Sequence, residues 1–410
     1  MSWTHVITIT AWGGMCGVWA ILLWMQHRLH RDGTIVSASV VPELSRDTDV
    51  CVVIPARNEE AGIVSCLETV LEQDLAHLRV VVVDDRSDDG TAEAVRSTSH
   101  RDARVSLRQI HTLPPGWLGK SHALTRATEG LTCDWLLFID ADCRLLSPTA
   151  IRAAVGEAQH RGVSLFTLLP ALATDGFWEG MLIPLCSAVM ALWYSRSNRP
   201  RAAGFANGQF LLIKREAYEA VSGHAAVRRA IIEDVPLAEA VRAAGYTTWT
   251  GGGGELISVR MYDSLTSIVR GWSRIFVGAL RSPLKIAASA AWLIAGSLGP
   301  FVAVPILVHA WWRVGFQAAP SLIPPTGLCL THIVLLTLVS YGFWGLSRCD
   351  RRYLWLYPLS VLGVLGILTH ALWTMTVSRR IGWRDTRYRF DRRARILDPV
   401  KPASNVGGNS

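Results

Sequence analysis

The sequence lacks the two glycine-rich loops that most often hold phosphate groups in nucleotide-binding proteins. No G-x-G-x-x-G follows the first apolar run, and no G-x-x-x-x-G-K-[ST] occurs anywhere in the 410 residues. A dinucleotide-dependent enzyme and a P-loop nucleotidase are therefore not expected. The eight cysteines contain no C-x-x-C pair, which argues against a zinc site or a disulfide framework and fits a reducing compartment.

Charged residues are scarce, and long apolar runs stand in their place. Only 18% of the residues are charged, whereas 50% are hydrophobic and 17 are tryptophans, a composition typical of membrane proteins with aromatic interfacial belts. Four runs are long enough to span a membrane: Val6 to Met25, Ile286 to Trp312, Leu322 to Leu346 and Tyr353 to Val377. The formal charge of +8 comes largely from residues 379–395, so it says little about the rest of the chain.

The region between these runs alternates short apolar segments with helical periodicity. The apolar segments are Val50–Ile54, Arg79–Val83, Arg104–Leu107 and Trp135–Ile139. Such short segments, rich in β-branched residues, predict strands buried on both faces of a parallel sheet. Between the first two, Ile63, Leu67, Val70 and Leu71 recur at helical spacing. The pattern predicts an α/β fold, in which ligands bind outside the carboxyl ends of the strands.

Polar and acidic groups follow three of these predicted strands. They are the segments Pro55–Glu59, Asp84–Asp85 and Asp140–Asp142. Two carboxylates two residues apart at a strand end can face one Mg2+ or Mn2+ ion that also carries a diphosphate. Acidic residues after a strand also cap the next helix, and Ser147-Pro148 marks a helix start nearby. The Asp140-Ala141-Asp142 motif alone leaves both roles open.

Lys120 is a second candidate for contact with phosphate. It lies in Gly116-Trp117-Leu118-Gly119-Lys120, at the start of a predicted helix. A lysine there opposes the helix dipole, and an anion beside it would explain the placement. An ordinary exposed lysine is the alternative.

Six motifs occur in a fixed order and carry a family resemblance. They read V-V-I-P-A-R-N-E-E, V-V-V-D-D-R-S-D-D-G-T, G-W-L-G-K, F-I-D-A-D, G-F-A-N-G-Q-F and I-I-E-D-V. Together they resemble the family 2 inverting glycosyltransferases with the GT-A fold, over about residues 48 to 275. Within that family, the G-W-L-G-K and Arg260-Met261-Tyr262 segments and the flanking apolar runs resemble membrane-bound hopanoid-associated and carotenoid glycosyltransferases. The resemblance implies a mixed, mostly parallel sheet flanked by helices.

The resemblance also implies roles for particular residues. Asp85, together with Asp84, matches the acidic position that holds the base or ribose of the nucleotide, and Pro55, Arg57 and Glu59 match the loop that lines the same pocket. Lys120 matches the basic residue near the diphosphate. Asp140 and Asp142 match the motif that binds the divalent cation and the sugar diphosphate, with Asp142 as the direct metal ligand. Asp234 matches the general base and Glu233 is its fallback, although acidic residues also favour the first turn of the helix predicted from Pro236 to Ala244.

The acceptor side is expected near Gly204–Gln209 and residues 270–274. A glycine allows close backbone approach to a ligand, and Asn207 and Gln209 are the polar candidates beside it. Processive members of the family carry Gln-x-x-Arg-Trp, where this chain reads Arg270-Gly271-Trp272-Ser273-Arg274. Trp272 could stack on an acceptor and Arg270 and Arg274 could meet the leaving phosphate, or the segment is a basic interfacial helix. The departure favours transfer of a single sugar. The glycine run 251–254 predicts a plain loop rather than a lid.

We expect four regions. Residues 1–27 form a transmembrane anchor, 46–280 the catalytic domain with an interfacial helix at 176–195, 284–378 transmembrane helices, and 379–410 a basic cytoplasmic tail with a disordered end. The tail is expected to touch anionic lipid rather than nucleic acid. Three spans after the anchor would place this basic tail outside, against the positive-inside tendency. A re-entrant hairpin at Ile286 to Trp312, which Gly296, Gly299, Pro300 and Pro305 interrupt, is an alternative, but it leaves other basic clusters outside.

The sequence therefore predicts a multi-pass glycosyltransferase of a bacterial inner membrane, with its catalytic domain facing the cytoplasm. It would move one sugar, with inversion, from a nucleotide-diphosphate sugar to a hopanoid or other polyisoprenoid lipid. A polyprenyl-phosphate sugar transferase is the alternative among enzymes, and it would need no deprotonating carboxylate. A non-catalytic membrane scaffold that keeps the fold is the alternative of another class.

Overall fold

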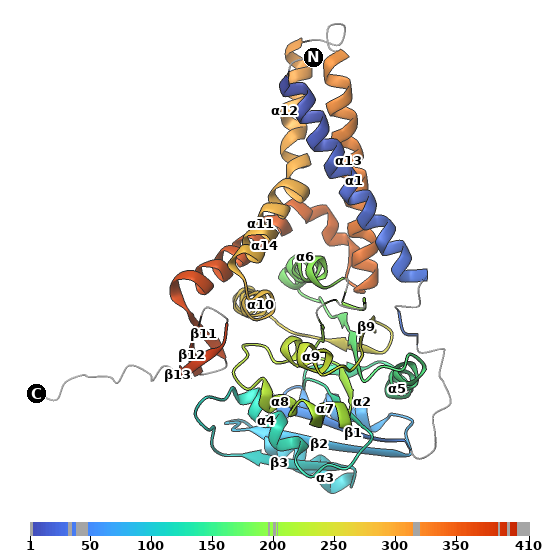
Figure 1. The fold of residues 1–410 in the computed structure, drawn as a ribbon, viewed down its shortest axis with the longest axis vertical. Coiled ribbons are helices and arrows are strands. Elements are labelled where there is room, and N and C mark those ends of the chain that lie inside the picture. The colour runs from blue at the N-terminus through green and yellow to red at the C-terminus, as the bar shows by residue number, and fades with distance from the viewer. Residues whose placement is uncertain are drawn as a thin grey trace, which may run out of the picture.

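The computed structural model describes residues 3–31, 35–37, 48–195, 197–199, 202, 204–314, 320–383, 386–391 and 394–399. An α/β domain, residues 48–280, forms one end of the molecule, and a bundle of apolar helices extends from it (Figure 1). The predicted disordered end of the tail lies outside the described residues.

The core of the α/β domain is a seven-stranded sheet in the order β3-β2-β1-β4-β8-β6-β9. Neighbouring strands from β3 to β4 are parallel, β8 is antiparallel to both of its neighbours, and β6 and β9 are parallel. The strands are β1 (Asp49–Ala56), β2 (His77–Asp85), β3 (Val105–Ile110), β4 (Trp135–Phe138), β6 (Leu165–Leu169), β8 (Leu211–Lys214) and β9 (Thr248–Gly252). The predicted α/β class, with a mixed and mostly parallel sheet, is confirmed.

Each face of this sheet buries its own set of helices, because successive strand residues point to opposite faces. Val50, Val52 and Ile54 of β1 belong to one apolar cluster, and Cys51 and Val53 belong to another. The first cluster includes side chains of α2 (Ile63–Leu71), α3 (Thr91–Arg101) and α5 (Ala150–His160). The second includes side chains of α4 (Gly119–Thr128), α7 (Arg215–Ala220) and α9 (Asp234–Ala243), and α8 (Gly223–Ala226) packs on α4.

A layer of helices separates the sheet from the apolar bundle. It contains α6 (Phe177–Tyr194) and α10 (Leu265–Leu280), which pack on each other (Figure 1). A small sheet of β5 (Cys143–Leu145), β10 (Ile257–Val259) and β7 (Ala171–Leu172) lies beside them. The expectation of a plain loop at 251–254 was wrong in part. Gly251 and Gly252 end β9 and pair with β6, and the carbonyl of Gly252 accepts a bond from Val36 N at 2.9 Å.

Five helical segments among the described residues are long and apolar enough to cross a membrane. They are the segments 9–28, 177–194, 283–314, 320–346 and 351–378. The elements they contain, besides α6, are α1 (Trp3–Arg31), α11 (Pro283–Trp292), η1 (Leu293–Leu298), α12 (Gly299–Val314), η2 (Pro320–Leu322), α13 (Ile323–Leu346), η3 (Arg351–Leu356), α14 (Tyr357–Trp373) and η4 (Thr374–Ser378). The apolar helices expected at both ends of the chain are present.

The segment 283–314 is a continuous helical path rather than a hairpin. Its middle, η1, is π-helical, a geometry that absorbs an irregularity without ending the helix. The carbonyl of Gly296 in η1 accepts two side-chain bonds, from Trp19 Nε1 of α1 at 3.0 Å and from His332 Nε2 of α13 at 2.8 Å. Trp12 Nε1 donates to His332 Nδ1 at 3.0 Å. Polar contacts therefore join three helices inside an apolar bundle, where an unpaired polar group is costly.

The basic segment after α14 forms strands, which the sequence analysis did not predict. β11 (Arg380–Trp383), β12 (Thr386–Phe390) and β13 (Ile396–Pro399) make an antiparallel sheet. Ile381, Phe390 and Ile396 are buried. The sheet attaches to the α/β domain through a bond from Ile396 N to the carbonyl of Arg229 at 2.8 Å and a bridge between Ala230 and Arg395. The segment therefore folds back onto the domain.

Replacing His332 with leucine should destabilise the helix bundle by about 1 kcal/mol and by no more than about 2 kcal/mol, the range of polar contacts between membrane helices. Leucine keeps much of the volume but removes both bonds of the imidazole. Unfolding in mixed micelles measures the change, with the exposed Thr331→Ala on the same helix as the control. Equal stability of the two variants would show that the Gly296 carbonyl does not need His332.

Candidate active site

The site lies where three neighbouring parallel strands end. β2, β1 and β4 are adjacent in the sheet, and their carboxyl ends lead into Asp84–Asp85, Pro55–Glu59 and Asp140–Asp142. The register pairs Ala56 with Asp84, so the first two ends lie side by side. A small pocket at this edge is lined by residues from several elements: Pro55, Lys120, Leu124, Phe138, Ile139, Asp140, Gly208, Leu211, His224, Glu233 and Asp234.

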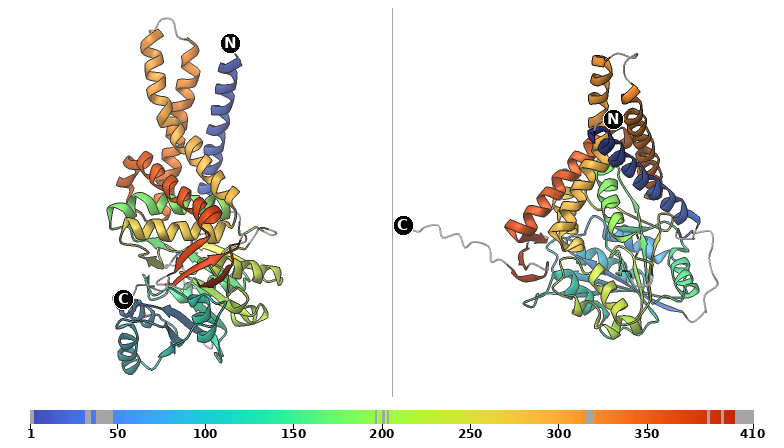
Figure 2. Two further views of the ribbon diagram at one scale, coloured as in Figure 1. Left: turned by 90° about the vertical axis from the view of Figure 1, so that its left-hand side faces the viewer. Right: turned by 45° about the horizontal axis from the view of Figure 1, so that its top comes forward.

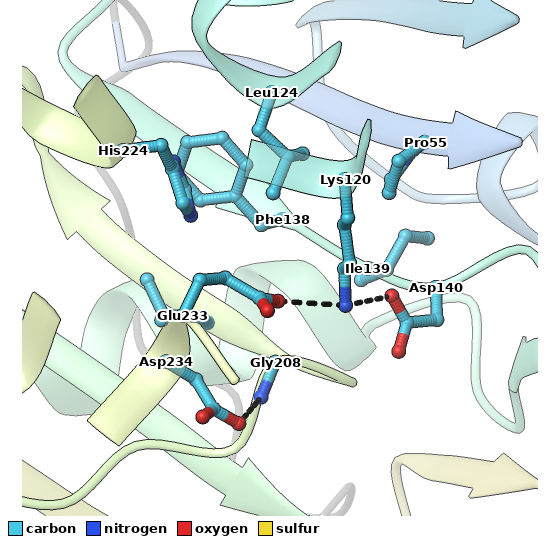
Figure 3. A pocket seen from close by; sticks show the side chains of 11 residues that line it. Pro55, Lys120, Leu124, Phe138, Ile139, Asp140, Gly208, His224, Glu233 and Asp234 are labelled. Carbon is cyan, nitrogen blue, oxygen red and sulfur yellow. Dashed lines mark hydrogen bonds and ion pairs between the residues drawn. The ribbon is translucent and has the colours of Figure 1, made fainter. Parts of the chain in front are cut away.

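Lys120 is the central charge of this pocket. Its Nζ lies 2.6 Å from Asp140 Oδ1 and 2.8 Å from Glu233 Oε1 (Figure 3). Burial alone would lower the pKa of Lys120, but the two carboxylates outweigh it and raise the pKa above its usual value. Likewise, burial favours a neutral Glu233, but Lys120 outweighs it and lowers the pKa of that carboxyl. Lys120 and Glu233 are therefore charged at neutral pH, and one lysine joins the end of β4 to the start of α9.

Asp234, the first residue of α9, has a different environment from Glu233 beside it. Asp234 Oδ2 accepts a bond from Gly208 N at 2.9 Å, and Oδ1 accepts one from Val235 N at 2.7 Å. Burial and the negative charge of Glu233 raise the pKa of Asp234 to about 7. Adjacent carboxyl groups whose pKa values are driven apart are a mark of acid–base chemistry. Asp234 can therefore gain or lose a proton near neutral pH while Glu233 stays ionised.

Among the described residues, the carboxylate of Asp142 forms no ion pair with a lysine or arginine side chain. Desolvation and the nearby charges of Asp140 and Glu59 raise the pKa of Asp142 to about 7. No group of three or more His, Cys, Asp or Glu side chains forms a ready-made metal centre within the described residues. Mg2+ and Mn2+ need only one or two carboxylates when phosphate oxygens and water complete the shell. Asp140 and Asp142 therefore fit such an ion, which would relieve the repulsion between them.

The two aspartates at the end of β2 differ in their surroundings. Both Asp85 oxygens accept bonds from Arg86, at 2.8 and 3.2 Å. A Cβ on Gly119 would lie 2.2 Å from Asp85 Oδ2, so the start of α4 passes directly over this carboxylate. Asp84 instead accepts a bond from Ser87 N at 3.2 Å and lies 3.4 Å from Gln109 Nε2. Asp84 therefore shapes the turn, whereas Asp85 faces Arg86 and the start of α4.

The loop that contains Arg57 and Glu59 is fixed against the loop after β2. Asn58 has a positive φ of 54°, and its side-chain oxygen accepts a bond from Asp88 N at 2.9 Å. Glu59 N donates to Thr91 Oγ1 at 2.8 Å. These bonds hold the predicted nucleotide loop in one conformation.

The predicted acceptor residues Asn207 and Gln209 flank a glycine that lines the pocket, but neither of them lines it. Asn207 and Gln209 bond to each other, Nδ2 to Oε1 at 3.1 Å and Gln209 N to Asn207 Oδ1 at 3.1 Å. Gly208 between them faces the pocket. A Cβ there would lie 3.2 Å from Glu233 Oε1, 3.4 Å from Lys120 Nζ and 3.5 Å from Asp234 Oδ2. The sequence predicted that a ligand could approach the backbone closely at a glycine in this segment. It did not predict that Glu233 and Asp234 at the start of α9 would lie next to Gly208.

The candidates on α10 do not line this pocket. Arg270 is exposed, whereas Trp272 is only 4% exposed and packs against Phe276. The expected stacking of Trp272 on an acceptor does not fit this burial. Arg274 is half-buried and lies close enough to Tyr262 to oppose the rise that burial causes in the pKa of that phenol.

Sequence reasoning missed two aromatic residues near the site. Tyr262 lies over α10, because a Cβ on Gly271 would meet its hydroxyl at 2.1 Å, and its pKa responds to Asp142 and Asp140. His224 lines the pocket and shares a 2.8 Å bond between Nδ1 and the Tyr218 hydroxyl. Burial lowers the pKa of His224 to about 4, so the imidazole lines the pocket as an uncharged group at neutral pH. Tyr262 belongs to the Arg260-Met261-Tyr262 segment, but the resemblance gave this residue no role, and His224 lies in none of the six motifs.

Comparisons with known proteins agree with this geometry. The family model for Glycosyl transferase family 2 matches residues 51–235. The chain is 29% identical over 252 residues to a 4,4'-diaponeurosporenoate glycosyltransferase of Staphylococcus aureus strain MRSA252, covering 60% of this chain and 66% of that protein. The corresponding protein of strain USA300 is 29% identical over 227 residues, covering 54% of this chain and 59% of its own length. The chain thus spans less than two thirds of these relatives.

A solved structure shows the same fold over most of the chain. It is the mannosyltransferase PcManGT from Pyrobaculum calidifontis in complex with GDP-Man and Mn2+, with a TM-score of 0.51 and 19% identity, covering 90% of this chain and 99% of that one. Residues 51–235 therefore match the Glycosyl transferase family 2 model, the fold is of the GT-A type, and apolar helices precede and follow the matched region in the sequence.

Proposed function

We propose that this protein is an inverting glycosyltransferase that moves a single sugar from a nucleotide-diphosphate sugar to a hydroxyl group of a membrane lipid. The observation that carries the proposal is the convergence of Lys120, Asp140, Glu233 and Asp234 at one edge of the sheet. The family 2 domain and the relatives that act on a carotenoid acid support the reaction class. The apolar helices support a lipid acceptor. We place the protein in a bacterial inner membrane, with the domain on the cytoplasmic side.

Asp234 is the proposed general base. Its carboxylate takes the proton from the acceptor hydroxyl, and the bond from Gly208 N keeps one oxygen in a fixed direction. The pKa of about 7 suits the role, because a base works best when its pKa is near the working pH. Glu233 stays ionised through Lys120 and keeps Asp234 more basic by repulsion.

The donor is proposed to bind across the ends of β1, β2 and β4. Asp85 would hold the nucleoside, with Pro55, Arg57 and Glu59 lining the same pocket. Lys120 would exchange its contact with Asp140 for the diphosphate and stabilise the negative charge that leaves with it. Asp142, with Asp140, would hold Mg2+ or Mn2+. Such an ion neutralises the diphosphate as it leaves.

The raised pKa of Asp234 favours a hydroxyl acceptor over the alternatives. A polyprenyl phosphate, or a carboxylate such as the relatives' diaponeurosporenoate, is already deprotonated at neutral pH and needs no base. A hopanoid or another polyisoprenoid alcohol does need one. The requirement for Asp234 therefore separates these acceptor classes.

Changing Asp234 to asparagine should reduce sugar transfer to a lipid alcohol by about 10²- to 10⁴-fold, the usual contribution of a general base. Donor binding should change little, because the acceptor proton is the group affected. Turnover by membranes with a labelled nucleotide sugar and calorimetry of donor binding measure the two effects. Asp74→Asn, on the distant Arg152–Asp74 surface pair, is the matched control. Substantial turnover by Asp234→Asn would favour a phosphate or carboxylate acceptor.

The transfer rate at subsaturating substrate should rise with pH through about 7. The active form of Asp234 is the deprotonated one, and burial with the charge of Glu233 raises its pKa to about 7, so activity is lost as the pH falls below that value. Removing the neighbouring charge in Glu233→Gln should move the midpoint to lower pH. Profiles of kcat/KM for both proteins test this. A midpoint that stays in place in Glu233→Gln would assign the titration to another group.

Binding of a nucleoside diphosphate should require the divalent ion and Asp142. Chelation of the ion, or Asp142→Asn, should weaken binding about tenfold or more, which corresponds to at least about 1.4 kcal/mol. Titration calorimetry with and without Mn2+ measures this on the full chain, again with Asp74→Asn as the control. Equal affinity for the nucleoside diphosphate with and without the ion would contradict metal-dependent binding and favour a metal-independent transferase. If the nucleoside diphosphate did not bind at all, the non-catalytic scaffold would be favoured.

A further inference from the structure

Both ends of the last apolar segment, 351–378, are attached to the α/β domain. Just before it, Leu172 N of the domain donates to the carbonyl of Ser347 at 3.1 Å. The Arg348 guanidinium lies 3.4 Å from Glu255 Oε1, also of the domain. The segment therefore begins at the surface of the α/β domain.

Just after it, the chain returns to the same domain. η4 ends at Ser378 and β11 begins at Arg380. The sheet that follows is joined to the domain by the bond from Ile396 N to the Arg229 carbonyl and by the Ala230–Arg395 bridge. A helix that crossed the membrane would deliver these strands to the opposite side from Arg229.

Three other apolar segments, α1, α11–α12 and α13, each run between the α/β domain and the far tip of the bundle. α1 begins at the far tip and runs to the α/β domain, where Val36 N bonds to the Gly252 carbonyl (Figures 1 and 2). The path α11–η1–α12 leaves the domain after α10 and ends at the far tip, and α13 returns from there beside α1.

We propose that the chain crosses the membrane three times, through α1, α11–α12 and α13, and that α14 lies within the leaflet on the side of the α/β domain. The inference needs the membrane location proposed above but not the transferase activity. α6 shares this arrangement, since both of its ends also join the domain and it packs on α14.

The two faces of α14 support a lipid contact. One face is buried against α6, α10 and α11, through residues such as Val361, Val364 and Leu368. The opposite face exposes large apolar side chains, with Leu359 and Leu362 each 53% exposed and Trp373 52%, and η4 continues this face with Val377, which is 68% exposed. These four recur at intervals that keep one stripe of the helix outward. Exposure of such a stripe to water would be unfavourable, and the adjoining bundle places lipid beside it.

The polar side chains on the outward face are already satisfied within the protein. The Thr369 hydroxyl donates to the Leu365 carbonyl at 2.8 Å and the Thr376 hydroxyl to the Leu372 carbonyl at 2.7 Å. His370 Nδ1 lies 2.9 Å from Ser273 Oγ of α10. Internal bonds of this kind are what a helix needs where water is absent.

This topology also gathers the basic residues on one side. Arg28 near the end of α1, Arg348 after α13 and Arg389 in β12 all lie at the domain end of the bundle, whereas Arg313 lies near the far tip. Basic residues favour the cytoplasmic side of a membrane. The conflict that four crossings created in the sequence analysis disappears when 351–378 does not cross.

Labelling of single introduced cysteines with a membrane-impermeant maleimide tests the topology. The eight native cysteines are buried, so the background is low. Arg389→Cys and Leu397→Cys report the tail, Glu72→Cys the α/β domain and Val314→Cys the far tip, all at exposed positions. We expect the cysteines at both tail positions to react in the same vesicle orientation as the cysteine of Glu72→Cys. The cysteine of Val314→Cys should react only in vesicles of the opposite orientation. Tail positions labelled together with Val314→Cys would overturn the proposal.

Spin labels on the outward face of α14 identify what covers it. A nitroxide at Leu362→Cys should be accessible to oxygen and protected from a water-soluble nickel chelate, as should the control Ile306→Cys on α12, which is 63% exposed. Glu72→Cys should show the opposite pattern. Access of the chelate to position 362 would place the face in water, and low access of both reagents would indicate a protein contact such as a second copy; either result contradicts a lipid contact. Neither measurement depends on turnover.

Discussion

The ion pairs of Lys120 are the interaction on which the site depends. They join Asp140, after the fourth strand, to Glu233, at the start of α9, across segments that are 93 residues apart in the chain. Removing one partner of a buried ion pair commonly costs about 3–5 kcal/mol, because the other charge is left uncompensated. The same lysine fixes the charge of Glu233, and that charge raises the pKa of Asp234. The proposed metal motif, phosphate contact and general base are thus one electrostatic unit. A donor phosphate that drew Lys120 away from Glu233 would change the charge next to Asp234.

The apolar helices and the α/β domain are connected at several points rather than through one linker. Val36, Ser347 and Ile396 each share a backbone bond with the domain. The third of these bonds is made to Arg229, only four residues before Glu233. The sheet β11–β13 therefore supports the segment that carries the carboxylates. If the apolar helices lie in a membrane as proposed, these three connections would keep the pocket at a fixed height above the leaflet, which would suit a lipid acceptor.

The strands and most helices followed from the sequence because their signals are local. Val50–Ile54 and Trp135–Phe138 are apolar on both faces, and both are strands in the buried middle of the sheet. The ordered motifs also pointed to Lys120, Asp140 and Asp234, which lie at one pocket. The failures concern partners that are distant in sequence. The arginine-rich tail forms strands in which Ile396 bonds to the backbone of Arg229. Gly251 and Gly252 belong to a strand because they pair with β6. Trp272 is buried by helices from elsewhere in the chain. The hydropathy of residues 351–378 predicted an apolar helical segment of this length, but it could not predict that both ends of the segment attach to the α/β domain.

The central claim is that one cation and one diphosphate join the carboxylates of this edge to Lys120. The most direct test is the anomalous signal of Mn2+ in crystals of the full chain grown with a nucleoside diphosphate. The account predicts a Mn2+ peak within about 2.5 Å of an Asp142 carboxylate oxygen, with a phosphate oxygen in the same shell and Lys120 turned toward the diphosphate. A peak away from Asp140 and Asp142, or a bound diphosphate that leaves Lys120 between Asp140 and Glu233, would contradict it.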